Sequence, residues 1–138
     1  MAVTRTNNTI LDHSAITMVA QSLAEDFNVT TDTNLYTVPP DKEFTPFAVC
    51  ISKASGSMTT ATCSFGQSGA KTDFLATQTL TGIGAAGDAI WCSPAHHATV
   101  PVGIVTYTAG EIFVIDHVVA QGGAMTADVS VFGFLNDA

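Results

Sequence analysis

Charged residues are scarce in this sequence, and basic residues are the scarcest. Charged side chains make up 12% of the 138 residues, against roughly 25% in an average soluble domain. Twelve Asp and Glu residues stand against four Lys and Arg, which gives a formal net charge of −8. The four bases, Arg5, Lys42, Lys53 and Lys71, are scattered along the chain. Nucleic acids and anionic membranes attract clustered Lys and Arg, so we expect neither as a partner.

Long apolar runs are also missing. No segment of the sequence approaches the roughly 18 apolar residues of a membrane-spanning helix. Residues 1–12 lack the basic start and the apolar centre of a secretory signal. We therefore expect the protein to stay in the cytoplasm in which it is made.

Cysteine is rare and odd in number, with Cys50, Cys63 and Cys92 as its three occurrences. In a chain without an export signal, we expect three small buried hydrophobic residues that remain reduced. An alternative is a cross-strand disulfide between Cys50 and Cys63, because these two residues flank a turn at residues 55–57.

Hydrophobic residues are plentiful, at 46% of the chain with a mean hydropathy of +0.33. So few charged groups cannot cover the outside of a small domain. The surface must therefore be made of Thr, Ser, Asn and Gln, or apolar surface must be hidden against partners. We expect both, and we predict obligate self-association.

Period-2 patterns dominate the chain, and helical periodicity is nearly absent. Only residues 16–23 fit either a helix or a strand, and their Thr and Val content with no clear helix cap favours a strand. Further strands are predicted at 35–38, 44–52, 59–65, 73–80, 89–92, 99–107, 111–120 and 127–135. The apolar run 47–51 is typical of a strand that is buried on both faces.

Strands that recur every 8–12 residues between turn signals are typical of a two-sheet β-sandwich or a barrel. We predict an all-β, jelly-roll-like sandwich formed by residues 15–138 as a single domain. Residues 1–14 are polar and without pattern, and we predict that they form a flexible N-terminal arm that orders when it meets a partner.

Histidine combinations are the first candidates for chemistry. The pair His96-His97 could bind zinc in a loop, but no third ligand follows at a recognisable spacing. The pair Asp116-His117 suggests a catalytic triad, yet neighbouring strand residues point to opposite faces and the sequence has no G-x-S-x-G motif. We therefore predict that His117 is a hydrogen-bonded histidine in the core or in an interface. Asp12-His13 has no recognisable partner.

Carboxylates and glycines give equally weak signals for a bound ligand. Glu25-Asp26 and Asp32 could bind calcium, but the regular D-x-D spacing is absent. Residues 82–87 match a dinucleotide-binding fingerprint by letters alone, without a following helix, and we interpret them as a loop of small residues. We expect no enzyme activity, no metal and no cofactor.

Trp91 and Tyr107 allow two interpretations. They could form a platform on which a sugar stacks, or they could be a core tryptophan and a tyrosine of an edge strand. The first interpretation supports an alternative function, described below.

Two phrases of the sequence resemble a known group of proteins. Residues 34–44, N-L-Y-T-V-P-P-D-K-E-F, resemble the "L-Y-T-V-P-x-x-K-x-F" opening of small tailed-bacteriophage structural domains. Residues 126–135, T-A-D-V-S-V-F-G-F-L, resemble their closing strand "T-V-D-V-F-G-Y-L". With the strand cadence between the two phrases, the likeness covers most of residues 16–135.

The resemblance implies a virion component, and capsid decoration (cement) proteins are the type that fits best. Such proteins are typically compact β domains that form homotrimers on the capsid surface and clamp the major capsid protein, after assembly in the host cytoplasm. No family motif assigns contact residues. From the polar arm we predict partner contacts by Arg5, Asn7 and Asn8. The alternative is a tail or fibre module that binds a host receptor or carbohydrate through Trp91 or Tyr107.

Overall fold

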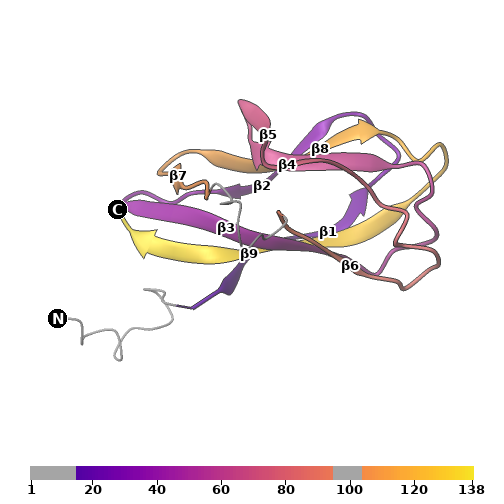
Figure 1. Cartoon of the computed structure of the whole chain (residues 1–138), viewed down its shortest axis with the longest axis horizontal. Coiled ribbons are helices and arrows are strands. Elements are labelled where there is room, and N and C mark those ends of the chain that lie inside the picture. Colours follow the sequence, from indigo (N-terminus) through magenta and orange to yellow (C-terminus); the bar gives the residue numbers. More distant parts are fainter. Residues whose placement is uncertain (1–14, 95–103) are drawn as a thin grey trace, which may run out of the picture.

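The computed structural model describes residues 15–94 and 104–138, which form a two-layer sandwich (Figure 1). The described part of the chain contains no helix, and therefore none that could span a membrane. Its strands are β1 (Thr17–Asp26), β2 (Asp32–Thr37), β3 (Lys42–Ser52), β4 (Thr62–Gln67), β5 (Ala70–Thr79), β6 (Ile90–Cys92), β7 (Tyr107–Thr108), β8 (Ile112–Val119) and β9 (Thr126–Asp137).

The strand order is that of a jelly roll. One sheet has the order β1-β9-β3-β6, with the short β7 added to β3, and the other has the order β2-β8-β4-β5. Apart from β7, strands pair from the outside inward: β1 with β9, β2 with β8, β3 with β6 and β4 with β5. This nesting is what results when one long antiparallel hairpin rolls up into two sheets. The predicted all-β, jelly-roll-like sandwich is confirmed.

The core lies between the two sheets and follows the period-2 pattern of the sequence. In β8, Phe113, Ile115 and His117 point inward and are almost completely buried. From the facing sheet, Phe44 packs edge-on against Phe113 with ring centroids 6.1 Å apart. Phe65 stacks on Phe113 from the neighbouring strand at 6.3 Å. One aromatic cluster therefore joins both layers.

Pro46 lies in the middle of the central strand β3, where a missing N–H interrupts the ladder. The strand accommodates it with a β-bulge between Pro46 and Ala48, opposite Gly133 and Phe132 of β9. The bulge turns Phe47 outward, and 43% of its surface is exposed. The prediction that the run 47–51 is buried on both faces is therefore wrong at Phe47.

The remaining predictions divide as follows. Residues 17–23 of the predicted strand 16–23 lie within β1, whereas only Tyr107, the first residue of β7, is in a strand among the described residues of the predicted strand 99–107. The expectation of three free cysteines is confirmed, with Cys63 and Cys92 buried and Cys50 half-buried. The alternative of a disulfide between Cys50 and Cys63 is wrong, because these residues belong to different sheets. The predicted arm of residues 1–14, with Arg5, Asn7 and Asn8, lies outside the described residues.

Candidate interaction surface

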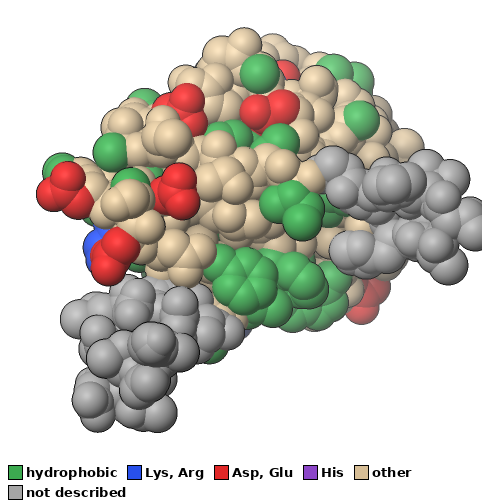
Figure 2. Space-filling model, turned by 60° about the vertical axis from the view of Figure 1, so that its left-hand side comes forward, with side chains coloured by type: hydrophobic (Ala, Val, Ile, Leu, Met, Phe, Trp, Pro, Cys, Tyr) green, Lys and Arg blue, Asp and Glu red, His purple; other side chains and the backbone are tan. Residues whose placement is uncertain are grey.

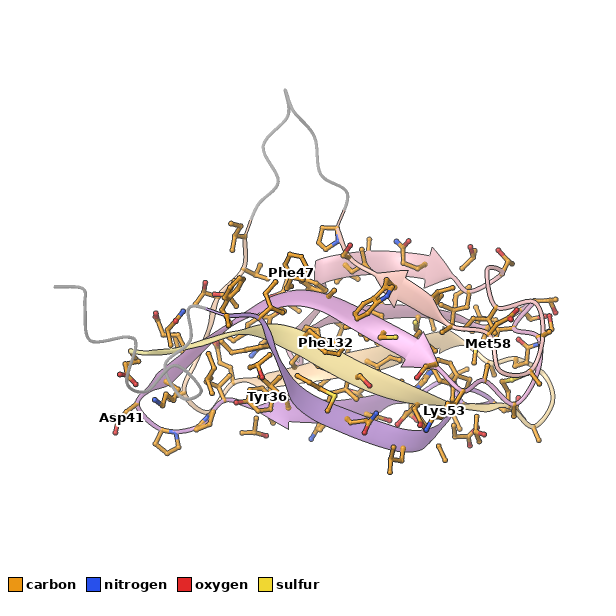
Figure 3. The ribbon with its side chains drawn as sticks, turned by 90° about the horizontal axis from the view of Figure 1, so that it is seen from below. Tyr36, Asp41, Phe47, Lys53, Met58 and Phe132 are labelled. Carbon is orange, nitrogen blue, oxygen red and sulfur yellow. The ribbon has the colours of Figure 1, made fainter. Side chains whose placement is uncertain are left out.

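The outer side of the five-stranded sheet carries a group of large apolar side chains. Directly opposed residues in neighbouring strands share a face of the sheet, and Met18 of β1, Phe132 of β9 and Ala48 of β3 form one such row. Figure 3 looks onto this side and shows Phe47 and Phe132 on adjacent strands. We call this surface the aromatic face; its large side chains are Met18, Phe47, Trp91, Phe132 and Phe134.

Trp91 lies on this surface in a row with small residues of the neighbouring strands. It lies opposite Cys50, which is in turn opposite Ser130. Its ring centroid is 5.2 Å from that of Phe132, two strands away. The small side chains between the two strands leave space for these two rings to approach each other, and Ser130 keeps only 6% of its surface exposed. Trp91 itself remains 64% exposed.

A second pair of rings extends the surface. Phe47, turned outward by the bulge, meets Phe134 edge-on with centroids 6.5 Å apart. Since a whole aromatic side chain has roughly 200 Å² of surface, the exposed fractions of Trp91 and Phe47 leave on the order of 200 Å² of ring uncovered. In Figure 2 the five-stranded sheet lies low, as in Figure 1, and hydrophobic side chains gather there.

The aromatic face is uncharged along its centre. Paired outward positions of β3 and β9 begin with Glu43 at one end and finish with Asp128 at the other. Every outward side chain between these two acids is polar and neutral, or apolar. A surface of this kind, rimmed by polar groups, is typical of protein contact sites.

The chain itself covers the outer side of the other sheet. Val114 and Ser64 point outward from β8 and β4, yet both are fully buried. The β4–β5 hairpin folds back there so closely that a Cβ atom on Gly66 would lie 2.4 Å from the carbonyl oxygen of Ala70. Lys71 of β5 then reaches across to Asp32 of β2, with N and O 3.3 Å apart. Only the five-stranded sheet therefore offers a broad uncovered apolar face among the described residues.

The predicted core histidine is confirmed, and its partner comes from the other sheet. His117 Nε2 lies 2.8 Å from Glu25 Oε2, and the same oxygen accepts a hydrogen bond from Thr33 Oγ1 at 2.7 Å. The other carboxylate oxygen accepts one from Ser22 Oγ at 2.8 Å. An ionised carboxylate only accepts hydrogen bonds, so His117 is the donor. The ring of Phe27 packs edge-on against His117 at 4.9 Å.

This network holds β1 of one sheet to β2 and β8 of the other. Burial raises the pKa of Glu25, but the hydrogen bonds from Thr33, His117 and Ser22 outweigh burial and lower the pKa overall. The arrangement is not a catalytic triad, because the hydroxyl of Ser22 donates to the carboxylate rather than contacting the imidazole. His117 and Glu25 are both buried, with 2% and 7% of their surfaces exposed. The chemistry is that of a structural clamp.

Tyr107 and Asp73 join the two sheets in the same way. The Tyr107 hydroxyl donates to Asp73 Oδ1 at 2.6 Å, from β7 of one sheet to β5 of the other. Burial, followed by this hydrogen bond, raises the pKa of Tyr107 well above its usual range. Only 3% of Tyr107 is exposed, so the prediction that it could be a sugar-stacking residue is wrong. Trp91 alone remains available for stacking.

The acids that the sequence analysis weighed as calcium ligands each have another partner. Asp26 accepts a hydrogen bond from the backbone of Asn28, and Asp32 pairs with Lys71, so these acids do not converge on a calcium ion. No group of three metal-binding side chains exists within residues 15–94 and 104–138. The pairs Asp12-His13 and His96-His97 lie outside those residues.

The backbone amides of the glycine-rich loop after β5 are hydrogen-bonded within the chain. Its exposed backbone amides at Gly84 and Ala85 both donate to Asp88 Oδ2, each at 3.0 Å. A carboxylate therefore already occupies the place where the oxygens of a nucleotide would bind. Ile83 anchors the loop because it is fully buried in the core.

No family model and no curated protein matches this sequence. Among solved structures, a chain of the acid-stable capsid of the Helicobacter pylori bacteriophage KHP30 matches with a TM-score of 0.52. The match covers 87% of this chain and 91% of that chain at 19% sequence identity. At this identity the likeness shows a shared fold. The resemblance to bacteriophage virion domains found in the sequence is confirmed at that level.

Proposed function

We propose that this chain is a bacteriophage capsid decoration protein, a structural subunit without enzymatic activity. Nearly the whole chain shares its fold with a chain of a bacteriophage capsid, and this observation carries the proposal. In the proposed role, the protein is assembled in the host cytoplasm, forms a homotrimer and sits on the outer surface of the capsid. There it binds the major capsid protein.

The internal chemistry of the domain supports a role in resisting force. His117 and Tyr107, which the sequence analysis weighed for a triad and for sugar stacking, instead hold the sheets together through Glu25 and Asp73. Breaking a buried pair such as Glu25 and His117 is strongly destabilising, at about 3–5 kcal/mol. A clamped sandwich fits a protein that must transmit load between its neighbours rather than open around a substrate.

The aromatic face supplies the means of attachment to other subunits. Burial of on the order of 200 Å² of exposed ring is worth roughly 5 kcal/mol before the cost of association. Repeated at every copy on a capsid lattice, such contacts add up. They oppose the outward pressure of a packaged genome by bridging subunits.

The test is the presence and the number of copies of this chain in purified virions of the phage that encodes it. Quantitative mass spectrometry should find it in stoichiometric ratio to the major capsid protein. Heads assembled by a phage in which this gene is deleted should form but burst at a lower temperature. Addition of the purified protein should restore their thermal stability. Absence of the chain from virions, or only a few copies at a tail, would refute the decoration role.

The predicted arm is tested in the same assay. A chain that lacks residues 1–14 should occupy gene-deleted heads less completely than the full chain. Substitution of Arg5, Asn7 and Asn8 by Ala should reproduce part of that loss. Equal occupancy by both variants would remove the arm from the account and leave the sandwich as the contact.

A second candidate is a tail or fibre module that binds a host receptor or carbohydrate. One observation favours it: Trp91 packs beside Phe132 and is still 64% exposed, and an exposed aromatic ring is a surface on which a sugar can stack. Binding on a glycan array that is lost in a folded W91A variant would establish this candidate. No binding by the parent protein would exclude it.

A further inference from the structure

The aromatic face has the area and composition of the centre of a subunit interface. A standard interface buries about 800 Å² on each partner, and its core is mostly apolar. Trp91 and Phe47 expose on the order of 200 Å² of ring, and Met18 beside Phe132 has another 49% of its surface exposed. Polar neutral neighbours such as Gln21 and Thr45 surround them. Without a cover, this surface would remain in water.

Charge favours another copy of the same chain as that cover. Each copy has a formal net charge of −8, so two copies repel wherever acidic surface meets acidic surface. On the aromatic face the acids Glu43 and Asp128 lie at opposite ends, and the centre between them is neutral. Identical copies can therefore approach through this face without bringing like charges together at its middle.

Shape favours the same partner. In a ring of three copies, each copy meets the next through different surfaces, and only residues close to the axis meet their own counterparts. On the aromatic face, large rings also lie beside the small side chains of Ala48, Cys50 and Ser130. A projecting ring of one copy can therefore pack against small residues of another.

We propose that the aromatic faces of neighbouring copies pack against one another around the symmetry axis of the trimer. This inference rests on the proposed function, because it names the face through which the proposed trimer forms. In the assembly, Phe47 and Trp91 of each copy are covered by the same residues of the other copies. The other exposed apolar side chains, such as Val118 on β8, stay outside this contact.

Trp91 reports directly on the proposal because it is the sole tryptophan in the sequence. In the trimer, the emission of the unmodified protein should be blue-shifted and protected from acrylamide. Dilution should shift the emission to the red and raise the quenching constant at the same concentration at which the mass in solution falls to the 14.3 kDa of one chain. Emission that stays red and fully quenchable while the mass remains that of a trimer would overturn the proposal.

Two variants with matched exposure locate the interface. Phe47 and Val118 each have 43% of their surface exposed, on opposite sheets. F47E should weaken association roughly tenfold or more and yield single chains, whereas V118E should keep the mass of the parent. Circular dichroism and thermal unfolding establish that each variant is folded. The Trp91 measurement decides the matter if F47E does not fold.

The outcomes separate this proposal from the function. A trimer that survives F47E, or that V118E disrupts instead, overturns the aromatic face as the interface while leaving the decoration role in place. A parent chain that is monomeric at every concentration overturns it as well. Whether the chain is present in virions is measured independently, and that result alone decides the proposed function.

Discussion

The clamp between Glu25 and His117 gives the sharpest quantitative prediction. The Glu25 carboxylate accepts three hydrogen bonds, from Ser22, Thr33 and His117, at 2.7–2.8 Å. The substitution E25Q keeps the shape but removes the charge, and turns an amide NH₂ group toward donors. A hydrogen bond to a charged group contributes about 1.5–3 kcal/mol. Some of the three bonds persist with a glutamine, so we expect a net loss of roughly 3 kcal/mol.

Chemical and thermal unfolding at neutral pH measure this loss. For a domain of this size, a loss of roughly 3 kcal/mol corresponds to a fall of about 10 °C in Tm. The control is E43Q, the same change at the half-buried Glu43 of β3, which should lower stability by less than about 0.5 kcal/mol. If E25Q and E43Q lose the same amount, or E25Q loses less than about 1 kcal/mol, the clamp is not a main support of the fold.

The pH dependence adds a second test of the same residue. The pKa of Glu25 is lowered in the folded protein, so the folded state holds this proton less tightly than the unfolded chain. The contribution of Glu25 to the free energy of unfolding is therefore complete above the ordinary pKa of glutamate and is lost as the pH falls through the lowered pKa. The difference in free energy of unfolding between the parent and E25Q should be largest at neutral pH and should shrink in that acidic range. A constant difference would contradict the assignment.

Three further outcomes follow from the structure. Y107F should lower the free energy of unfolding in urea by about 1–2 kcal/mol, because Asp73 loses its buried donor. The pKa of Tyr107 is raised in the folded protein, so its stabilising contribution is complete below the ordinary tyrosine pKa and is lost as the pH rises above it. An alkaline unfolding transition that is the same in Y107F and the parent would contradict this. G133A should cost about 3 kcal/mol or more, because its Cβ would lie 2.4 Å from the Thr45 carbonyl oxygen; a stable variant would refute that packing. Cys63 and Cys92 should react slowly with a thiol reagent at pH 8 and quickly after unfolding, because burial raises the pKa of both, to about 11 for Cys92. Rapid reaction of these two thiols in the native state would contradict their burial.

The strands could be predicted from sequence because their signals are local. In β8, the period of two residues places His117 on the same face as Phe113 and Ile115, and the structure has all three buried. The pairing of strands could not be predicted, because it depends on contacts such as β1 with β9, more than 100 residues apart. The cadence of strands indicated a jelly roll without giving its order.

The candidate surface was only partly predictable for the same reason. Trp91 was recognised as a possible stacking residue, but not the rings beside it, since Phe132 meets Trp91 only through the long-range pairing of β9 with β3. A usable signal for Phe47 was present in the sequence. Pro46 inside a strand indicates a bulge, and a bulge changes the direction of the next side chain. The partner of His117 was missed because Glu25 lies 92 residues away.

A cryo-electron microscopy map of the virion of the encoding phage is the most direct test of a structural role carried by the aromatic face. We expect jelly-roll density on the outside of the capsid, in groups of three, with Trp91 and Phe47 buried between copies. Capsid density that leaves no place for this domain, or domains whose aromatic faces point into solvent, would contradict it.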